Sequence, residues 1–340
     1  MAKVGVGVVG CGGNGRRHAE LYNSMDEVEL IGVYDMIPEA AERVAKQHRV
    51  KAFTSIEELV NDDRVEAINA VNSGSHAGPV VAAGNAGKHV LVEVPFAVTV
   101  EECDRMIEAT EKGGVNLMYA QTHRYYPYNV TIKSMIDAGE IGDLIWITFT
   151  RTGSGDPTSD KWHRWKKTGG GTLTYEGPHY TDQIRWLAGS DYDTAVVIGM
   201  GRYASGGDGE DTVIGGFTFK NGVFAALIDA KANPGGNYSD WRIGGTEGMI
   251  EIKGTVARLG KGDWVDIDYP HKNDPPVEGF ERLSEATHYR GFLTEFQEFI
   301  ASINEGRPPA STGYDGRASI EAALALRKAG ETGQPVKFPL

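Results

Sequence analysis

The chain of 340 residues carries 34 basic and 47 acidic side chains, which gives a net charge of −13 and a pI near 5.2. Nucleic acids and anionic membranes need a basic protein face, so this balance argues against either as the main partner. The length suits two domains. No apolar run approaches the roughly 18 residues of a membrane span, and the first residues lead directly into a strand, so we expect a cytoplasmic protein.

The first apolar run, residues 4–9, leads into a glycine-rich turn. Gly10, Gly12 and Gly15 fit the spacing G-x-G-x-x-G, in which glycines allow a tight turn, close approach of a pyrophosphate and close helix–strand packing. A helix that opens at Asn14 would direct free N–H groups at that anion. An ordinary strand–turn–helix corner can show the same spacing, so the turn alone is weak evidence.

A second apolar run, residues 28–34, ends in Asp35, twenty positions after Gly15. An acidic residue at this place hydrogen-bonds the ribose hydroxyls of a bound dinucleotide. Its carboxylate would repel the 2′-phosphate of NADP, and Met36 stands where an arginine would be expected for that phosphate. The pattern therefore predicts dinucleotide binding, with NAD preferred over NADP.

The rest of the first half alternates helices and strands. We predict one helix over 38–48 and another that follows His76 and ends at 86. Two further helices are expected to begin at the capping boxes of residues 55–58 and 99–102. Strands are expected at 67–71, 89–92 and 115–120. Alternation of this kind predicts a doubly wound parallel sheet, an α/β Rossmann domain over residues 1–122.

The second half has a different pattern. Helices are expected over 128–138, 179–187, 292–304 and 314–329, and strands at 144–150, 195–199, 212–219, 223–230, 241–244, 249–252 and 264–269, with a long loop to residue 171. Strands joined by short turns such as Lys220-Asn-Gly222 indicate an open, mostly antiparallel sheet. Residues 123–340 are thus predicted to form an α+β domain.

Cysteine and histidine spacing gives no indication of a metal or redox site. Cys11 and Cys103 belong to no C-x-x-C pair, and Cys11 reads as a small residue in the turn. The nine histidines show no H-x₃-H or H-E-x-x-H spacing. We therefore predict no bound metal.

Taken together, several motifs resemble those of the Gfo/Idh/MocA family (glucose-fructose oxidoreductase, inositol dehydrogenase and relatives). The matching segments are residues 6–15, His76, 87–95, 169–182, 304–308 and 313–316. The resemblance implies an N-terminal Rossmann domain and a C-terminal open sheet that carries substrate and often oligomer contacts. It implies cofactor contacts from Gly10, Gly12, Gly13, Asn14, Gly15, Asp35, Asn72, His76, Glu93 and Val94.

Two positions depart from the family pattern. Family dehydrogenases usually have Glu-Lys-Pro, with the lysine as catalytic cation, where this chain has Glu93-Val94-Pro95. The family commonly has aspartate four residues before the catalytic histidine; here Tyr175 stands there with Glu176 beside it, and His179 is kept. The resemblance therefore implies a catalytic group of His179, Tyr175 and Glu176 that works without the lysine.

Oxidation of a secondary alcohol needs a base for the hydroxyl proton. The ordinary pKa of a histidine, about 6.5, makes His179 workable as an acid/base alone. A tyrosine, with a pKa of about 10, becomes a base at neutral pH only beside a cation or a proton relay. Arg124, Arg164 and His163 are candidate neighbours for Tyr175.

Substrate contacts are expected from two further segments. His123 and Arg124 follow the last Rossmann strand, at the edge where ligands bind in such sheets. Trp162, His163 and Arg164 lie in the long loop, where aromatic and basic side chains could bind a sugar ring or a carboxylate. A packed structural loop is an equally good interpretation of either segment.

Three functions remain open from the sequence. The leading one is an NAD-dependent oxidoreductase that acts on a sugar, cyclic polyol or similar hydroxylated molecule. The second is a redox-neutral NAD-dependent glycoside hydrolase or lyase, suggested by Val94 and Tyr175 and by similarity to such members of the superfamily. The third is a non-catalytic NAD-bound sensor. A large open sheet usually needs covering, which predicts a homodimer or homotetramer.

Overall fold

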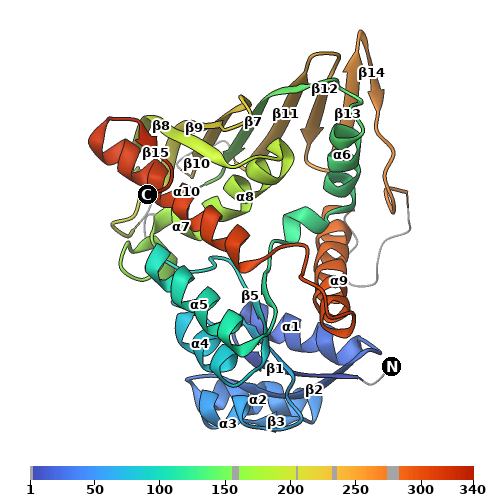
Figure 1. The fold of residues 1–340 in the computed structure, drawn as a ribbon, viewed down its shortest axis with the longest axis vertical. Coiled ribbons are helices and arrows are strands. Elements are labelled where there is room, and N and C mark those ends of the chain that lie inside the picture. Colours follow the sequence, from blue (N-terminus) through green and yellow to red (C-terminus); the bar gives the residue numbers. More distant parts are fainter. Residues whose placement is uncertain (1–2, 155–160, 204–205, 232–235, 274–282) are drawn as a thin grey trace. The chain divides into compact units, whose positions relative to one another are not determined.

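The computed structural model of the protein describes residues 3–154, 161–203, 206–231, 236–273 and 283–340. The chain divides into two compact units (Figure 1). Unit 1 is Met1–Gln121 with Leu293–Ile320, and unit 2 is Thr122–Phe292 with Glu321–Leu340. The return of the chain to unit 1 differs from the expectation that all of 123–340 forms the second domain. One reason is aromatic packing, because Phe296 stacks on Tyr22 of unit 1 with ring centroids 4.5 Å apart.

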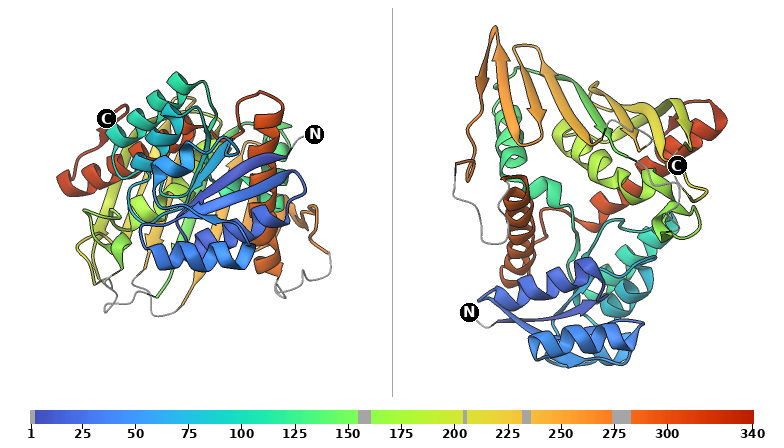
Figure 2. Two further views of the ribbon diagram at one scale, coloured as in Figure 1. Left: turned by 90° about the horizontal axis from the view of Figure 1, so that it is seen from below. Right: turned by 180° about the vertical axis from the view of Figure 1, so that it is seen from behind.

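Unit 1 is built on a six-stranded parallel sheet with the strand order β3-β2-β1-β4-β5-β6. Its strands are β1 (Val4–Val9), β2 (Val28–Tyr34), β3 (Lys51–Ala52), β4 (Ala67–Ala70), β5 (His89–Val92) and β6 (Leu117–Tyr119). Its helices are α1 (Gly13–Ser24), α2 (Pro38–His48), α3 (Ile56–Val60), α4 (Ala77–Asn85) and α5 (Val100–Gly113). Helices α1 and α2 lie on one face of the sheet and α4 and α5 on the other (Figure 2), which confirms the predicted doubly wound fold.

The local sequence explains these elements. All six residues of β1 are buried, as expected for a central strand with helices on both faces. The hydroxyl oxygens of Ser55 and Thr99 accept the N–H groups of Glu58 and Glu102, at 3.0 and 3.1 Å, and so cap α3 and α5 as predicted.

Unit 2 contains a nine-stranded sheet with the order β14-β13-β12-β11-β7-β10-β9-β8-β15. The strands are β7 (Leu144–Thr152), β8 (Tyr192–Gly201), β9 (Thr212–Phe219), β10 (Phe224–Ala230), β11 (Tyr238–Gly245), β12 (Met249–Lys253), β13 (Val256–Lys261), β14 (Asp263–Asp266) and β15 (Val336–Lys337). Short helices η1 (Thr122–Tyr125), η2 (Trp162–Arg164) and α7 (Gly171–Tyr175) join the longer α6 (Pro127–Asp137), α8 (Gly177–Ala188), α9 (Leu283–Asn304) and α10 (Gly313–Thr332). Neighbouring strands are antiparallel except β7 and β10, which are parallel.

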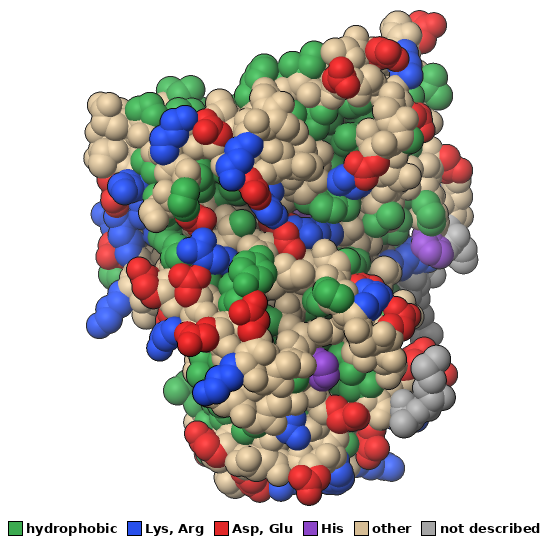
Figure 3. All heavy atoms as spheres, viewed as in Figure 1, with side chains coloured by type: hydrophobic (Ala, Val, Ile, Leu, Met, Phe, Trp, Pro, Cys, Tyr) green, Lys and Arg blue, Asp and Glu red, His purple; other side chains and the backbone are tan. Residues whose placement is uncertain are grey.

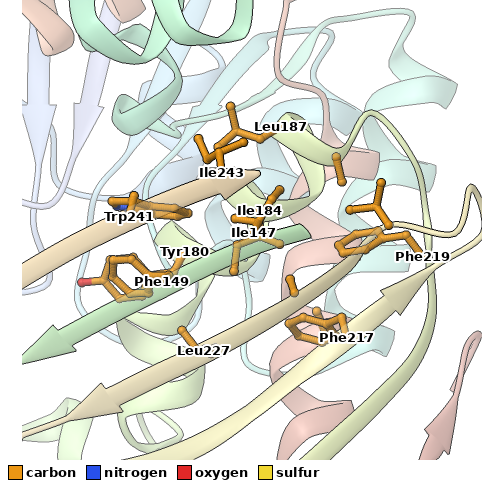
Figure 4. Packing of buried hydrophobic residues seen from close by; sticks show 14 of the residues in the cluster. Ile147, Phe149, Tyr180, Ile184, Leu187, Phe217, Phe219, Leu227, Trp241 and Ile243 are labelled. Atoms are coloured by element: carbon orange, nitrogen blue, oxygen red, sulfur yellow. The ribbon is translucent and has the colours of Figure 1, made fainter. Parts of the chain in front are cut away.

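The core of unit 2 lies between one face of this sheet and its helices. Phe149 of β7 contacts Tyr180 of α8 and Trp241 of β11, with ring centroids 4.2 and 4.3 Å apart (Figure 4). Ile147 and Leu227 extend the same apolar layer along β7 and β10. The opposite face of the sheet is exposed, as expected for an open antiparallel sheet.

The surface carries charged side chains of both signs. Figure 3 shows basic side chains interspersed with acidic ones over the face in view, and no continuous basic area gathers there. Within the described part of the chain, no helix combines the length and the apolar character that a bilayer span requires.

Candidate active site

The glycine-rich turn after β1 brings segments of backbone into close contact. Gly10 has a φ of +105°, and a Cβ there would lie 2.7 Å from the backbone of Asn72. A Cβ on Gly15 would lie 1.9 Å from the carbonyl oxygen of Gly10. Both distances are far below van der Waals contact, so a larger residue at either place would push the backbone apart.

Two other glycines leave open space at the start of α1. A Cβ on Gly12 or Gly13 would have no heavy atom within 4 Å. Gly12 is the N-cap residue, and no described side chain caps the helix, so the first N–H groups, including that of Asn14, can still donate. Open space in front of uncapped N–H groups fits the pyrophosphate of a dinucleotide.

Asp35 follows β2 at the edge of this turn. Its Oδ2 accepts the N–H of Cys11 at 2.6 Å and its Oδ1 accepts the N–H of Ile37 at 2.9 Å, which fixes the carboxylate. Met36 beside it is 84% exposed and brings no positive charge. Burial, together with the charge of Asp35, raises the pKa of Cys11 to about 12, so this thiol is not a nucleophile.

Two loops follow the carboxyl ends of β4 and β5, where ligands bind in doubly wound sheets. His76 joins these loops, because its ring nitrogens lie 2.9 Å from the carbonyl oxygen of Asn72 and 2.8 Å from that of Pro95. Burial lowers the pKa of His76. Glu93 is buried too; its Oε1 lies 3.1 Å from Nε2 of His18, and its Oε2 accepts the N–H of Val94.

Helix α8 of unit 2 carries His179 in its first turn. The ring of His179 stacks on that of His123, with centroids 4.7 Å apart and 18° between the planes. Nδ1 of His123 lies 3.3 Å from Oε1 of Gln183, one turn further along α8. Burial, and then the charge of His179, hold the pKa of His123 well below its usual range, so His123 is neutral near pH 7.

The long loop brings another imidazole against the predicted catalytic group. The ring of His163 stacks on Tyr175, with centroids 4.2 Å apart and 9° between the planes. Burial and the neighbouring Arg164 lower the pKa of His163. A neutral imidazole does little to lower the pKa of a phenol. The side chain of Trp162 lies outside the described part of the structure.

Glu176 lies between two cations. Its Oε2 is contacted by Nη1 of Arg151 and by Nζ of Lys231, and Nη1 also contacts the hydroxyl of Tyr180. Burial alone would raise the pKa of Glu176, but the charges of Arg151 and Lys231 outweigh it and bring the pKa to about 2. This carboxylate is therefore ionised throughout the working range of pH.

Arg124, which we predicted as a substrate contact, has its guanidinium bound to a helix residue. Its Nε and Nη2 donate to the two carboxylate oxygens of Asp182 at 2.7 and 2.6 Å, and both side chains are buried. This bidentate pair fixes η1, and with it His123, against α8. Asp182 therefore links α8 to η1.

The sequence interpretation did not single out Arg151, Asp229 or Lys231. Their spacing along the strands could have indicated them. Inward-facing residues alternate along β7 and β10, and these charged residues occupy the inward positions that follow Phe149 and Leu227. No group of three or more His, Cys, Asp and Glu residues suited to a metal ion occurs among the described residues.

Curated relatives span nearly the whole chain. The inositol 2-dehydrogenase of Salmonella typhimurium is 29% identical over 335 residues, which cover 96% of this chain and 94% of the relative. The myo-inositol 2-dehydrogenase of Thermotoga maritima is 25% identical over 341 residues, 98% of each.

Solved structures share the fold. Levoglucosan dehydrogenase in complex with NADH and levoglucosan has a TM-score of 0.88 at 20% identity and covers 99% of this chain and 100% of its own. GenD2 from gentamicin A biosynthesis, in complex with NAD, has a TM-score of 0.85 at 24% identity and covers 100% of this chain and 97% of its own.

Two family patterns match the chain. Residues 4–121 match the family described as "Oxidoreductase family, NAD-binding Rossmann fold", and residues 133–338 match "Oxidoreductase family, C-terminal alpha/beta domain". These ranges cover most of both units. The chain therefore belongs to the Gfo/Idh/MocA oxidoreductase family, and unit 1 contains its NAD-binding Rossmann domain.

Proposed function

We propose that this protein is an NAD-dependent dehydrogenase that oxidises a hydroxyl-bearing carbon of a sugar, a cyclic polyol or a related small molecule. The observation that carries the proposal is His179, a half-buried imidazole in the first turn of α8 that stacks on the neutral ring of His123. The names of the relatives, inositol and levoglucosan dehydrogenases, support this substrate class.

His179 accepts the proton of the substrate hydroxyl, since Val94 supplies no cation for that task. His123 is the neutral neighbour that orients the ring of His179. Tyr175, which stacks on His163, and Glu176 belong to the same group and position the substrate. NAD, when bound, supplies the hydride acceptor.

We infer a preference for NAD over NADP from Asp35 and Met36. The fixed carboxylate of Asp35 suits the ribose hydroxyls of NAD and repels a 2′-phosphate. The turn at Gly12 and Gly13 and the uncapped start of α1 would hold the pyrophosphate.

The proposal is tested by incubating the protein with NAD and a panel of inositols and sugars while NADH absorbance is followed. We expect NADH to form with at least one of these compounds, and no NADH formation with any of them would contradict the proposal. Glycoside cleavage without added NAD, with solvent deuterium entering the neighbouring carbon, would instead support the redox-neutral alternative.

We also propose that the exposed face of the unit 2 sheet pairs with a second copy of the chain. Val196, Ile214 and Phe224, on three adjacent strands of this sheet, are 40%, 39% and 51% exposed. Exposed apolar side chains on one face of a sheet are typical of an association surface, and two copies of the same face suit a two-fold axis. The proposed state is a dimer or a tetramer built from it.

A further inference from the structure

The helix-facing side of the unit 2 sheet changes from apolar to charged at the ends of two adjacent strands. Along β7, Phe149 is followed at the next inward position by Arg151; along β10, Leu227 is followed by Asp229 and then, beyond the strand, by Lys231. The two strands are parallel, with Asp229 beside Arg151. The charged residues therefore gather at the same end of the apolar core.

The residues at this end are reachable from solvent. Arg151 and Lys231 both contact Oε2 of Glu176, and their side chains are 32% and 16% exposed, against 26% for Glu176. Arg151 uses a single nitrogen, Nη1, for its contacts with Glu176 and Tyr180. Among the described residues no acceptor contacts its Nε or Nη2. The N–H groups of Nε and Nη2, which form one edge of the guanidinium, can therefore donate hydrogen bonds to a ligand.

The local charge is neutral to positive, although the protein as a whole carries −13. Asp229 is 1% exposed, and its Oδ1 has no hydrogen-bond partner among the described residues. Burial raises the pKa of Asp229 to about 6, despite the charge of Lys231. With Glu176 ionised, the two cations leave a net charge that lies between zero and one positive unit, depending on Asp229.

The positive field of the pair reaches the predicted substrate residues on both neighbouring segments. The charge of Arg151 contributes to the lowered pKa of His123, and that of Lys231 to the lowered pKa of His163, in both cases less than burial and other neighbouring groups. Arg151 and Lys231 therefore act on the same region of unit 2 as the catalytic group.

We propose that Arg151 and Lys231 bind a carboxylate of the substrate, so that the substrate is a sugar acid or an acidic polyol. A planar guanidinium edge beside an ammonium is suited to a carboxylate. The two cations face Glu176 and Asp229, so the group carries at most one surplus positive charge, and none once Asp229 is ionised; such a group suits a carboxylate better than a phosphate dianion. The inference rests on the proposed dehydrogenase function for its substrate class, but binding can be measured without turnover.

The test compares acids with their neutral counterparts on the full-length protein saturated with NAD. D-Glucuronate is paired with D-glucose, D-galacturonate with D-galactose and D-gluconate with sorbitol, and binding is followed by calorimetry. Lys231→Met removes the ammonium, and Lys231→Arg restores a cation. Lys220→Met is the matched control, because exposed Lys220 precedes the opposite end of β10.

We expect at least one acid to bind about tenfold more tightly than its neutral counterpart, and Lys231→Met to remove that difference. Lys231→Arg should restore most of it, and Lys220→Met should leave it intact. An unchanged unfolding temperature excludes a folding defect in Lys231→Met. If that variant unfolds at a lower temperature, Arg151→Lys gives the same comparison, because it keeps the positive charge but removes the planar guanidinium.

A panel in which no acid binds more tightly than its neutral counterpart overturns the proposal. So does a preference for an acid that survives in Lys231→Met. D-Glucose 6-phosphate is the third arm, and tighter, Lys231-dependent binding of this phosphate would refute a carboxylate site. NADH formation from neutral polyols alone would overturn this inference but support the dehydrogenase function. Lys231-dependent binding of an acid without NADH formation would support this inference but contradict the dehydrogenase function.

Discussion

The imidazole rings of His179 and His123 stack with their centroids 4.7 Å apart, on a helix and on a short 3-10 helix that Arg124 and Asp182 hold together. The pKa of His123 is held well below its usual range by burial and by the charge of His179. His123 is therefore the neutral member of this pair near pH 7. The stacked neighbour restricts the ring orientation and takes no proton itself.

This relationship predicts unequal effects of two matched substitutions. His179→Asn removes the base, and we expect kcat to fall by roughly 10² to 10⁴. His123→Asn removes only a positioning contact, so we expect a fall of about tenfold or less. Initial rates of NADH formation measure both. His271→Asn is the control, because His271 is exposed and has a φ of +67° that asparagine tolerates. Equal losses at 123 and 179 would contradict the assignment.

The glycine turn predicts that two alanine substitutions separate folding from cofactor binding. Gly15→Ala places a Cβ 1.9 Å from a backbone oxygen, so we expect a loss of several kcal/mol or failure to fold. Gly12→Ala meets no atom within 4 Å, so the fold should persist while the added methyl occupies the space for the pyrophosphate and weakens NAD binding about tenfold or more. Thermal unfolding and NAD titration measure the two effects.

Asp35 predicts cofactor preference. Asp35→Asn removes the negative charge and keeps one oxygen that can accept the N–H of Cys11. We expect NAD affinity to fall by about tenfold, which corresponds to about 1.4 kcal/mol, and NADP affinity to rise because the repulsion is gone. Calorimetric titration with both cofactors measures the change. An unchanged ratio of the two affinities would mean that Asp35 plays no part in selection.

Many of the helices and strands could be predicted from local sequence patterns. Ser55 and Thr99 predicted the starts of α3 and α5, because a helix cap is a contact between residues less than four positions apart. The apolar run of β1 predicted a buried central strand. Strands β3, β13 and β15 and helix α7 were not predicted. The two-residue strands β3 and β15 are defined mainly by their partners in the sheet, and Gly171 begins α7 at a φ of +76°.

Candidate site residues could be proposed from the sequence where a motif is contiguous, and could not be proposed where it is not. Gly10 to Gly15 lie within one turn, and His179 lies in a stretch that resembles the family. Arg151 and Lys231 are eighty positions apart and meet only because β10 pairs in parallel with β7. The sequence-based interpretation of an open, mostly antiparallel sheet did not assign strand partners, so it could not bring these residues together.

The open sheet face predicts a charge-sensitive oligomer. Phe224→Glu places a carboxylate on the exposed patch, and near a two-fold axis the two copies would repel each other. We expect the mass in solution, measured by light scattering, to fall to that of a monomer. Val130→Glu is the control, because Val130 is a similarly exposed apolar residue on α6. A wild-type protein that is already monomeric would contradict the proposed pairing.

Buried Asp229 predicts an unusual dependence of stability on pH. Its pKa is about 6 in the folded protein, because of burial, against about 3.9 in an unfolded chain. Between these values the folded state binds the extra proton, so its contribution to stability is present below pH 4 and is lost as the pH rises through about 6. Asp229→Asn cannot titrate. We therefore expect its stability relative to wild type to rise from pH 4 to pH 6, by about 1 to 3 kcal/mol.

Urea unfolding at several pH values measures this difference, and Asp266→Asn on exposed β14 is the control. A difference that stays flat over this window would show that the Asp229 carboxyl is not protonated in the folded state. The opposite slope, with the variant losing stability as the pH rises, would mean that ionised Asp229 is stabilised by Lys231 and Arg151.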